Sequence, residues 1–222
     1  MATDDSSMNG VAPDPFTGAD DAPATDSLRR WTQRLDARAD AFVDHVRSPA
    51  LDRIMYPLSS AADHSVLWHA LGAWRALRTG DTRNARRLGL ILGAESALTN
   101  GVIKSWFRRV RPTDGPGTQA EPGEQDGPLP YGLRRPVTSS FPSGHATAAF
   151  TAAVVLADAR SAPFYFGLAA AVAASRVYVR LHHASDVVAG AALGCVFGIV
   201  ARRILPVSTP RRVRATKRYR IQ

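Results

Sequence analysis

The chain has 222 residues, of which 45% are hydrophobic, and it carries a formal net charge of +9. This length and apolar content favour one domain with a substantial core plus tails. The single cysteine, Cys195, excludes an intrachain disulfide framework and a cysteine-based metal site, while the positive charge indicates an anionic partner: nucleic acid, an anionic membrane or a phosphorylated substrate.

The first part of the chain divides into an acidic tail and an amphipathic helix. Residues 1–26 contain six aspartates and no lysine or arginine, the opposite of a signal peptide, and they predict a disordered tail. From Ser27 to about Arg47 apolar residues recur at helical spacing, so region 27–53 is predicted to hold an amphipathic helix. The pattern fits two interpretations equally: the helix packs on the domain, or it lies in a membrane interface with Trp31 at headgroup level.

Region 54–205 is predicted to be a helical catalytic domain built from apolar segments. None of these reaches the roughly 18 apolar residues that alone indicate a transmembrane helix, so length leaves a soluble bundle open. Their alanine and glycine content favours a membrane, because small residues let helices approach closely where lipid supplies no hydrophobic drive. The predicted fold is all-α, a multi-span membrane bundle of about five to six helices. The segments are residues 56–77, 88–103, 146–156, 163–174 and 187–201.

Basic residues are sorted toward one side of this predicted bundle. Residues 74–87 hold five arginines against one aspartate, and residues 202–220 hold eight lysines or arginines and no acid. With segments that alternate in direction, both stretches, and so the basic tail 206–222, fall on the cytoplasmic side of a multi-pass cell-membrane protein. The polar clusters described next then fall on the extracytoplasmic side. The irregular region 113–136, rich in Gly and Pro, is interpreted as an insertion rather than a lid.

A polar turn, Pro142-Ser143-Gly144-His145, opens one of the apolar segments. Proline suits the first turn of a helix, Ser143 can cap it, and Gly144 lets the backbone approach a ligand, so the first N–H groups can bind an anion. Arginine grips phosphate oxygens with two parallel hydrogen bonds, and lysine adds a compact charge. The cationic side chains predicted to join the turn in a phosphate site are Lys104, Arg111 and Arg176.

Two histidines supply the remaining groups that phosphoryl transfer requires. His182 and Asp186 are four residues apart, so on a helix or turn the carboxylate can hold one ring nitrogen protonated while the other attacks phosphorus. His145 is then expected to protonate the departing oxygen. Neither His64 nor His69 is followed by a carboxylate four residues later, and both are interpreted as structural.

The chain resembles the phosphatidic acid phosphatase type 2 superfamily in all three parts of its signature: Lys104-x6-Arg111-Pro112, Pro142-Ser143-Gly144-His145 and Ser175-Arg176-x5-His182-x3-Asp186. The resemblance implies the helical architecture shared with haloperoxidases and a mechanism without metal or cofactor. It also implies a phosphohistidine on His182, a ring oriented by Asp186 and leaving-group protonation by His145. Phosphate binding would fall to Lys104, Arg111, Ser143, Gly144 and Arg176. Membrane members usually have six spans, so the helix near Trp31 would stand in for the first.

These observations predict an enzyme that hydrolyses a lipid phosphate or diphosphate, such as phosphatidate, a polyprenyl phosphate or undecaprenyl diphosphate. The expected partners are that lipid and the bilayer, with no nucleic acid. A vanadium-dependent haloperoxidase or a non-specific acid phosphatase would use the same site, but haloperoxidases are larger soluble proteins, which this short Ala-rich chain fits poorly. A non-catalytic basic membrane scaffold would have no need for His182 and Asp186 at this spacing.

Overall fold

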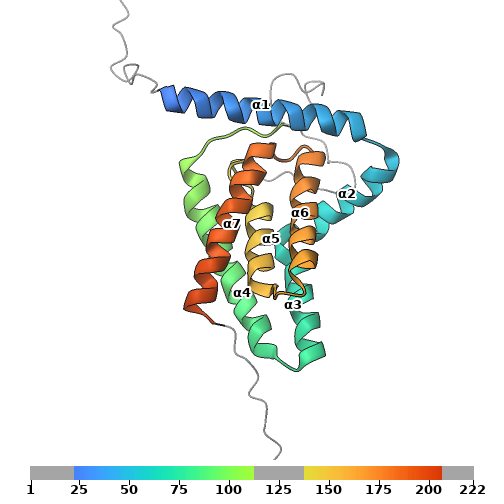
Figure 1. Ribbon diagram of the computed structural model, residues 1–222, viewed down its shortest axis with the longest axis vertical. Helices are drawn as coiled ribbons and strands as arrows, with labels where there is room; N and C mark the ends of the chain where they lie inside the picture. The colour runs from blue at the N-terminus through green and yellow to red at the C-terminus, as the bar shows by residue number, and fades with distance from the viewer. Residues whose placement is uncertain (1–22, 113–137, 207–222) are drawn as a thin grey trace, which may run out of the picture.

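The computed structural model describes residues 23–112 and 138–206, and within these every regular element is a helix (Figure 1). The prediction of an all-α fold is confirmed for this part of the chain, while the predicted insertion 113–136 lies outside it. The α-helices are α1 (Pro23–Val46), α2 (Pro49–Ala61), α3 (Val66–Thr79), α4 (Thr82–Ser96), α5 (Gly144–Leu156), α6 (Ala162–Tyr178) and α7 (Ala184–Ile204). Three short elements join them: the 3-10 turns η1 (Asp63–Ser65) and η3 (Ile103–Trp106), and the π-helical η2 (Ala97–Val102).

The amphipathic region at the start of the chain forms two helices. α1 begins at Pro23, inside the segment predicted to be a disordered tail, because proline fits the first turn of a helix and Asp26 forms an ion pair with Arg30 one turn later. α1 ends before Ser48, whose extended backbone and capping hydroxyl start α2 with a 3.4 Å hydrogen bond from the Leu51 amide. α2 therefore runs across the boundary predicted near residue 54.

The two predicted segments before the insertion are interrupted. Segment 56–77 is broken at η1, where His64 and Ser65 adopt left-handed φ angles of 51° and 61°. Segment 88–103 is α4 followed by the π-helical and 3-10 turns of η2 and η3. Both interruptions contribute residues to the wall of one cavity. A π-helical turn of this kind is frequent at functional sites.

α5 lies at the centre of the bundle, surrounded by α3, α4, α6 and α7, while α1 lies across one end (Figure 1). Its alanines fill the core: Ala146, Ala149 and Ala152 are fully buried. At the end that α1 covers, the apolar face of α1 contributes Val43 to a second buried cluster that includes Tyr178. The buried side chains of α5 thus fix the axis around which the other helices are placed.

A row of glycines brings α7 into close contact with α5. Gly190, Gly194 and Gly198 recur every four residues, and a Cβ added at Gly194 would lie 2.3 Å from the carbonyl oxygen of Thr147. No side chain fits in such a space, so glycine is required for this helix separation. The amide of Ser143 also donates a 3.0 Å hydrogen bond to the carbonyl of Asp186. The first turns of α5 and α7 are consequently held side by side.

One helix within the described residues, α7, is long and apolar enough to cross a membrane by its length and composition. α5 is equally apolar in character but has only 13 residues. Both helices belong to the segments predicted from the sequence, and each begins at the end of the bundle that carries the polar clusters.

Candidate active site

A polar cavity of about 430 Å3 lies near the end of the bundle that α1 covers. Its wall is formed by η1, by the end of α4 with η2 and η3, by the first turn of α5 and by the turn before α7. It is lined by five of the residues predicted to form the site: Lys104, Arg111, Gly144, His145 and His182. The other three, Ser143, Arg176 and Asp186, are fully or almost fully buried behind this wall. Segments far apart in the sequence therefore converge on one space.

The Pro142–His145 turn begins α5 as the sequence indicates. Ser143 is the N-cap, and its Oγ accepts a 3.5 Å hydrogen bond from the Ala146 amide. A Cβ added at Gly144 would lie 3.6 Å from Lys104 Nζ and 3.4 Å from Asn100 Oδ1, so the bare backbone faces the cavity. The turn thus presents main-chain N–H groups beside a lysine, which is a suitable environment for an anion.

Lys104 and Arg111 place two buried positive charges at the cavity. Lys104 Nζ lies 3.4 Å from Thr138 Oγ1, and burial, with the charges of Arg111 and Arg176, lowers the pKa of Lys104 to about 8. Arg111 donates to the carbonyls of Leu181 at 2.6 Å and Thr138 at 2.9 Å, which fixes its guanidinium. Positive charges held close together repel each other, and a bound anion would relieve this repulsion. The cluster therefore favours binding of an anion.

Arg176 is 1% exposed and, unlike Lys104 and Arg111, does not line the cavity. Its Nη1 donates to Ser59 Oγ at 2.5 Å and lies 3.7 Å from Asp63 Oδ1. The guanidinium predicted to bind phosphate is therefore held by residues of α2 and η1. Its positive charge lies directly behind the cavity wall.

His182 faces the cavity from the turn between α6 and α7. Its Nε2 lies 3.3 Å from Arg111 Nη1, and its Nδ1 lies 3.7 Å from Asp186 Oδ2. Burial lowers the pKa of His182 to about 3, an effect that the neighbouring Asp186 opposes and Arg111 reinforces. The imidazole is thus neutral near pH 7, as a nitrogen nucleophile must be.

The structure adds Asp63 to the residues found from the sequence. Asp63 Oδ1 lies 2.7 Å from His145 Nε2. Burial raises the pKa of Asp63, but the hydrogen bond from His145 and the charges of His145 and Arg176 outweigh it, so the pKa lies below its usual value. The left-handed backbone at His64 and Ser65 turns the chain so that Asp63 points back at α5. The sequence signal was the polar Asp-His-Ser run inside an apolar segment.

Arg109 is a second residue that the sequence reasoning missed. Its Nη1 donates to Asp186 Oδ1 at 2.6 Å and to Ser185 Oγ at 2.7 Å, while its Nη2 donates to Asp36 Oδ2 on α1 at 2.6 Å. In the run Arg108-Arg109-Val110-Arg111 nothing distinguishes this arginine from its neighbours. Its partners lie on α1 and α7, so only the assembled fold reveals them.

Comparison with known proteins agrees with this geometry and defines the chain as a phosphoric monoester hydrolase. The chain belongs to the PAP2 superfamily, whose family model matches residues 84–210. It is 30% identical over 146 residues to the decaprenylphosphoryl-5-phosphoribose phosphatase of Mycobacterium tuberculosis, an alignment covering 64% of this chain and 74% of that protein. It is 35% identical over 136 residues to the protein of the same name from Mycolicibacterium smegmatis, covering 60% and 67% respectively.

The same fold occurs in two solved structures, one of which is a transmembrane phosphatase. The transmembrane PAP2-type phosphatidylglycerolphosphate phosphatase of Bacillus subtilis superimposes with a TM-score of 0.58 at 22% identity, covering 81% of this chain and 87% of that one. LpxE of Aquifex aeolicus gives a TM-score of 0.58 at 25% identity, covering 75% and 94%. The helical bundle is therefore the fold of PAP2 membrane phosphatases.

Proposed function

We propose that the protein removes the phosphate of a membrane lipid phosphomonoester through a phosphohistidine on His182. The observation that carries this proposal is the pair of imidazoles, His182 and His145, on the wall of one cation-lined cavity. In the first step Nε2 of His182 forms a bond to phosphorus, and the bond from phosphorus to the lipid oxygen breaks. His145 gives its proton to that oxygen. In the second step water attacks phosphorus, His145 takes a proton from the water, and the P–N bond breaks to restore His182.

The remaining polar groups would stabilise the charge on the transferred phosphoryl group. Lys104 and Arg111 reach its oxygens directly, and the N–H groups after Ser143 add uncharged donors, while Arg176 contributes its charge from behind the wall. Asp186 would keep the proton of His182 on Nδ1, leaving Nε2 free to attack. No step of this sequence calls for a metal or a cofactor.

Asp63 supports the assignment of His145 as the proton donor. Asp63 Oδ1 lies 2.7 Å from His145 Nε2, and this carboxylate opposes the burial and the charge of Arg176 that lower the pKa of His145 to about 4. The lipid oxygen would replace this carboxylate as the acceptor when substrate binds. Asp63 thus acts as a positioning residue that keeps the proton-bearing nitrogen turned toward the cavity.

The proposed location is a membrane, with the cavity at the extracytoplasmic face and the C-terminal segment in the cytoplasm. The sorting of arginines in residues 74–87 and 202–220 supports this orientation. The apolar α7 and the membrane phosphatases of the same fold support insertion. α1, lying across the cavity end with Trp31 and Phe42 exposed, would rest in the interface.

The proposed substrate class is a phosphorylated sugar carried on a polyprenyl lipid rather than a polyprenyl diphosphate. The curated relatives are named as phosphatases of a decaprenyl-linked phosphoribose. The cavity offers hydrogen-bonding groups suited to sugar hydroxyls on the wall formed by η1, α4 and η2, namely Ser65, Glu95, Ser96 and Asn100.

The test is phosphate release by the purified protein from four lipids: a polyprenylphosphoryl pentose phosphate, phosphatidate, phosphatidylglycerolphosphate and undecaprenyl diphosphate. We expect the highest kcat/KM for the sugar phosphate. Replacing His182 by Ala should bring release from every substrate to background with membrane insertion intact. A phosphoenzyme trapped by alkaline quenching in the wild type and absent from His182→Ala would identify the nucleophile. Unchanged release in that variant would refute it, and a preference for the diphosphate would refute the substrate class.

A further inference from the structure

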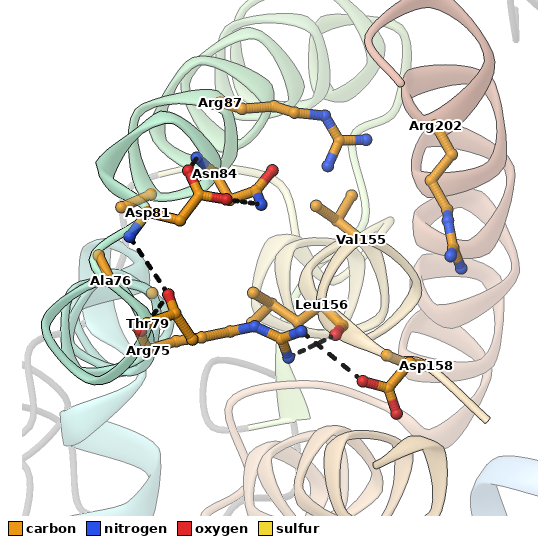
Figure 2. Close-up of a pocket in the computed structure, with 13 residues that line it drawn as sticks. Arg75, Ala76, Thr79, Asp81, Asn84, Arg87, Val155, Leu156, Asp158 and Arg202 are labelled. Atoms are coloured by element: carbon orange, nitrogen blue, oxygen red, sulfur yellow. Dashed lines mark hydrogen bonds and ion pairs between the residues drawn. The ribbon is translucent and has the colours of Figure 1, made fainter. Parts of the chain in front are cut away.

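A second basic cavity, of about 260 Å3, lies at the end of the bundle away from the active site. It lies among α3, α4, α5 and α7, and its cations are Arg75, Arg87 and Arg202. Figure 2 shows these three guanidinium groups entering one space beside Val155 and Leu156 from three different helices. None of these residues has a part in the phosphatase mechanism.

Each of these arginines is held in place by a carbonyl at the end of a helix. Arg75 donates to Leu156 at 3.2 Å and Arg202 donates to Val154 at 3.1 Å, both at the end of α5. Arg87 donates through Nε to Leu205, just after α7. These bonds satisfy carbonyls that a helix leaves without partners, and they position the guanidiniums before any ligand arrives.

The positive charge at Arg87 and Arg202 is left without an acidic partner among the described residues. Arg87 Nη2 is buried and has no hydrogen-bond acceptor there, and the positive charge of Arg202 acts on it unfavourably. Of the two carboxylates on the cavity wall, Asp158 lies 3.6 Å from Arg75, and Asp81 caps α4 and binds Asn84. A bound anion would accept the unused N–H group and offset the repulsion.

A neighbouring hollow supplies an apolar surface beside these charges. It shares Arg87 and Asn84 with the basic cavity and is otherwise walled partly by Leu90, Ile204 and Leu205. Leu90 and Ile204 are 69% and 70% exposed. The phosphate group of a phospholipid would bind the arginines while its acyl chains contact the apolar surface. Free phosphate would bind the arginines alone.

We propose that this cavity binds the headgroup phosphate of an anionic phospholipid, at the face of the bundle opposite the active site. Basic pockets between helices on the cytoplasmic side are the usual form of such lipid sites. The proposal does not depend on the phosphatase function, because the two cavities share no residue. Loss of activity in a His182 variant therefore says nothing about this second site.

The test uses the full chain purified in a neutral detergent. The thermal unfolding midpoint is measured with added phosphatidylglycerol, phosphatidylcholine or inorganic phosphate. Phosphatidylglycerol is a phosphodiester, so a phosphomonoesterase leaves it intact. The variants are Arg87→Gln, Arg202→Gln and their combination, and the control is Arg160→Gln, an exposed arginine between α5 and α6 that makes the same change in charge.

We expect phosphatidylglycerol, but not phosphatidylcholine, to raise the midpoint of the wild type and of Arg160→Gln. The concentration for half of this shift should rise by about tenfold or more in the double variant, because two charge-assisted hydrogen-bonding groups are lost. Comparing shifts within each variant removes any change in basal stability, and the single variants keep the test valid should the double variant not fold. An equal shift in the double variant and in Arg160→Gln overturns the proposal. An arginine-dependent shift with inorganic phosphate alone overturns the assignment to a lipid.

Discussion

Asp36 on α1 and Asp186 on α7 bind the same guanidinium group. Arg109 donates to each of them at 2.6 Å through its two terminal nitrogens. Asp36 also accepts a 2.8 Å hydrogen bond from the Ser185 amide at the start of α7. The helix that lies across the active-site end is thereby connected to the carboxylate beside His182.

This connection predicts that Arg109→Gln lowers kcat with little change in KM. Asp186 would lose a hydrogen bond from a charged donor, a loss of about 1.5–3 kcal/mol, which corresponds to a roughly 10- to 100-fold slower step if it is felt in the transition state. Steady-state kinetics on the purified variant provide the measurement. Arg108→Gln, an exposed neighbour, is the matched control and should be unaffected. A fall in Arg109→Gln that merely follows a loss of folded protein would argue for a structural role alone.

The 2.7 Å contact of Asp63 with His145 predicts a change in the acid step. Asp63→Asn keeps the shape of the side chain but removes the negative charge that stabilises the protonated ring. We expect kcat to fall by about tenfold or more for a lipid with a poor leaving group. A substrate with an activated leaving group, such as p-nitrophenyl phosphate, needs little protonation, so its rate should be much less affected. Equal losses on both substrates would exclude Asp63 from proton donation.

The lowered pKa of Lys104, about 8, predicts an alkaline loss of substrate capture. The amine is charged below pH 8 and becomes neutral as the pH rises through that value. Because kcat/KM reports the free enzyme, it should fall above about pH 8. Lys104→Arg, whose guanidinium stays charged, should move this fall to higher pH. A profile that is identical in the two proteins would show that another group titrates there.

The close contact of Gly194 with α5 predicts a stability effect. Gly194→Ala would place a methyl group 2.3 Å from the Thr147 carbonyl, and we expect a loss of about 1–3 kcal/mol in the free energy of unfolding. Gly167→Ala on α6 is the control, because a Cβ at that position meets no atom within 4 Å. There alanine should be neutral or stabilising by up to about 1 kcal/mol. Chemical denaturation in detergent measures both variants, and equal stabilities would contradict this account.

Features of the fold that depend on neighbouring residues could be predicted from the sequence, whereas features that depend on contacts between distant segments could not. The start of α5 at Gly144 follows from the local chemistry of the capping Ser143, and the all-helical fold follows from apolar periodicity. The break at η1 was missed although the polar run Asp63-His64-Ser65 interrupts the apolar segment, because the left-handed angles at His64 and Ser65 arise only from the assembled fold.

Hydrogen bonds between residues far apart in the chain could not be predicted from sequence patterns. Arg109 looks like every other arginine of its run until α1 places Asp36 against it. The same is true of Asp63, which lies 82 residues from His145 in the sequence. Five of the eight residues singled out by the motifs line one cavity, because they lie at helix ends and turns that the fold brings to the same end of the bundle.

The hydrogen bond from the Ser143 amide to the Asp186 carbonyl, together with the glycine row below it, makes the starts of α5 and α7 a single stiff unit. The opposite wall comes from the η1 and η2 breaks, which no such row of glycines ties to α5. Side chains of the second wall other than Asp63, such as Ser65 and Asn100, can therefore change without altering the contact between α5 and α7. Substitutions at these positions should change headgroup preference while the packing of α5 against α7 stays the same.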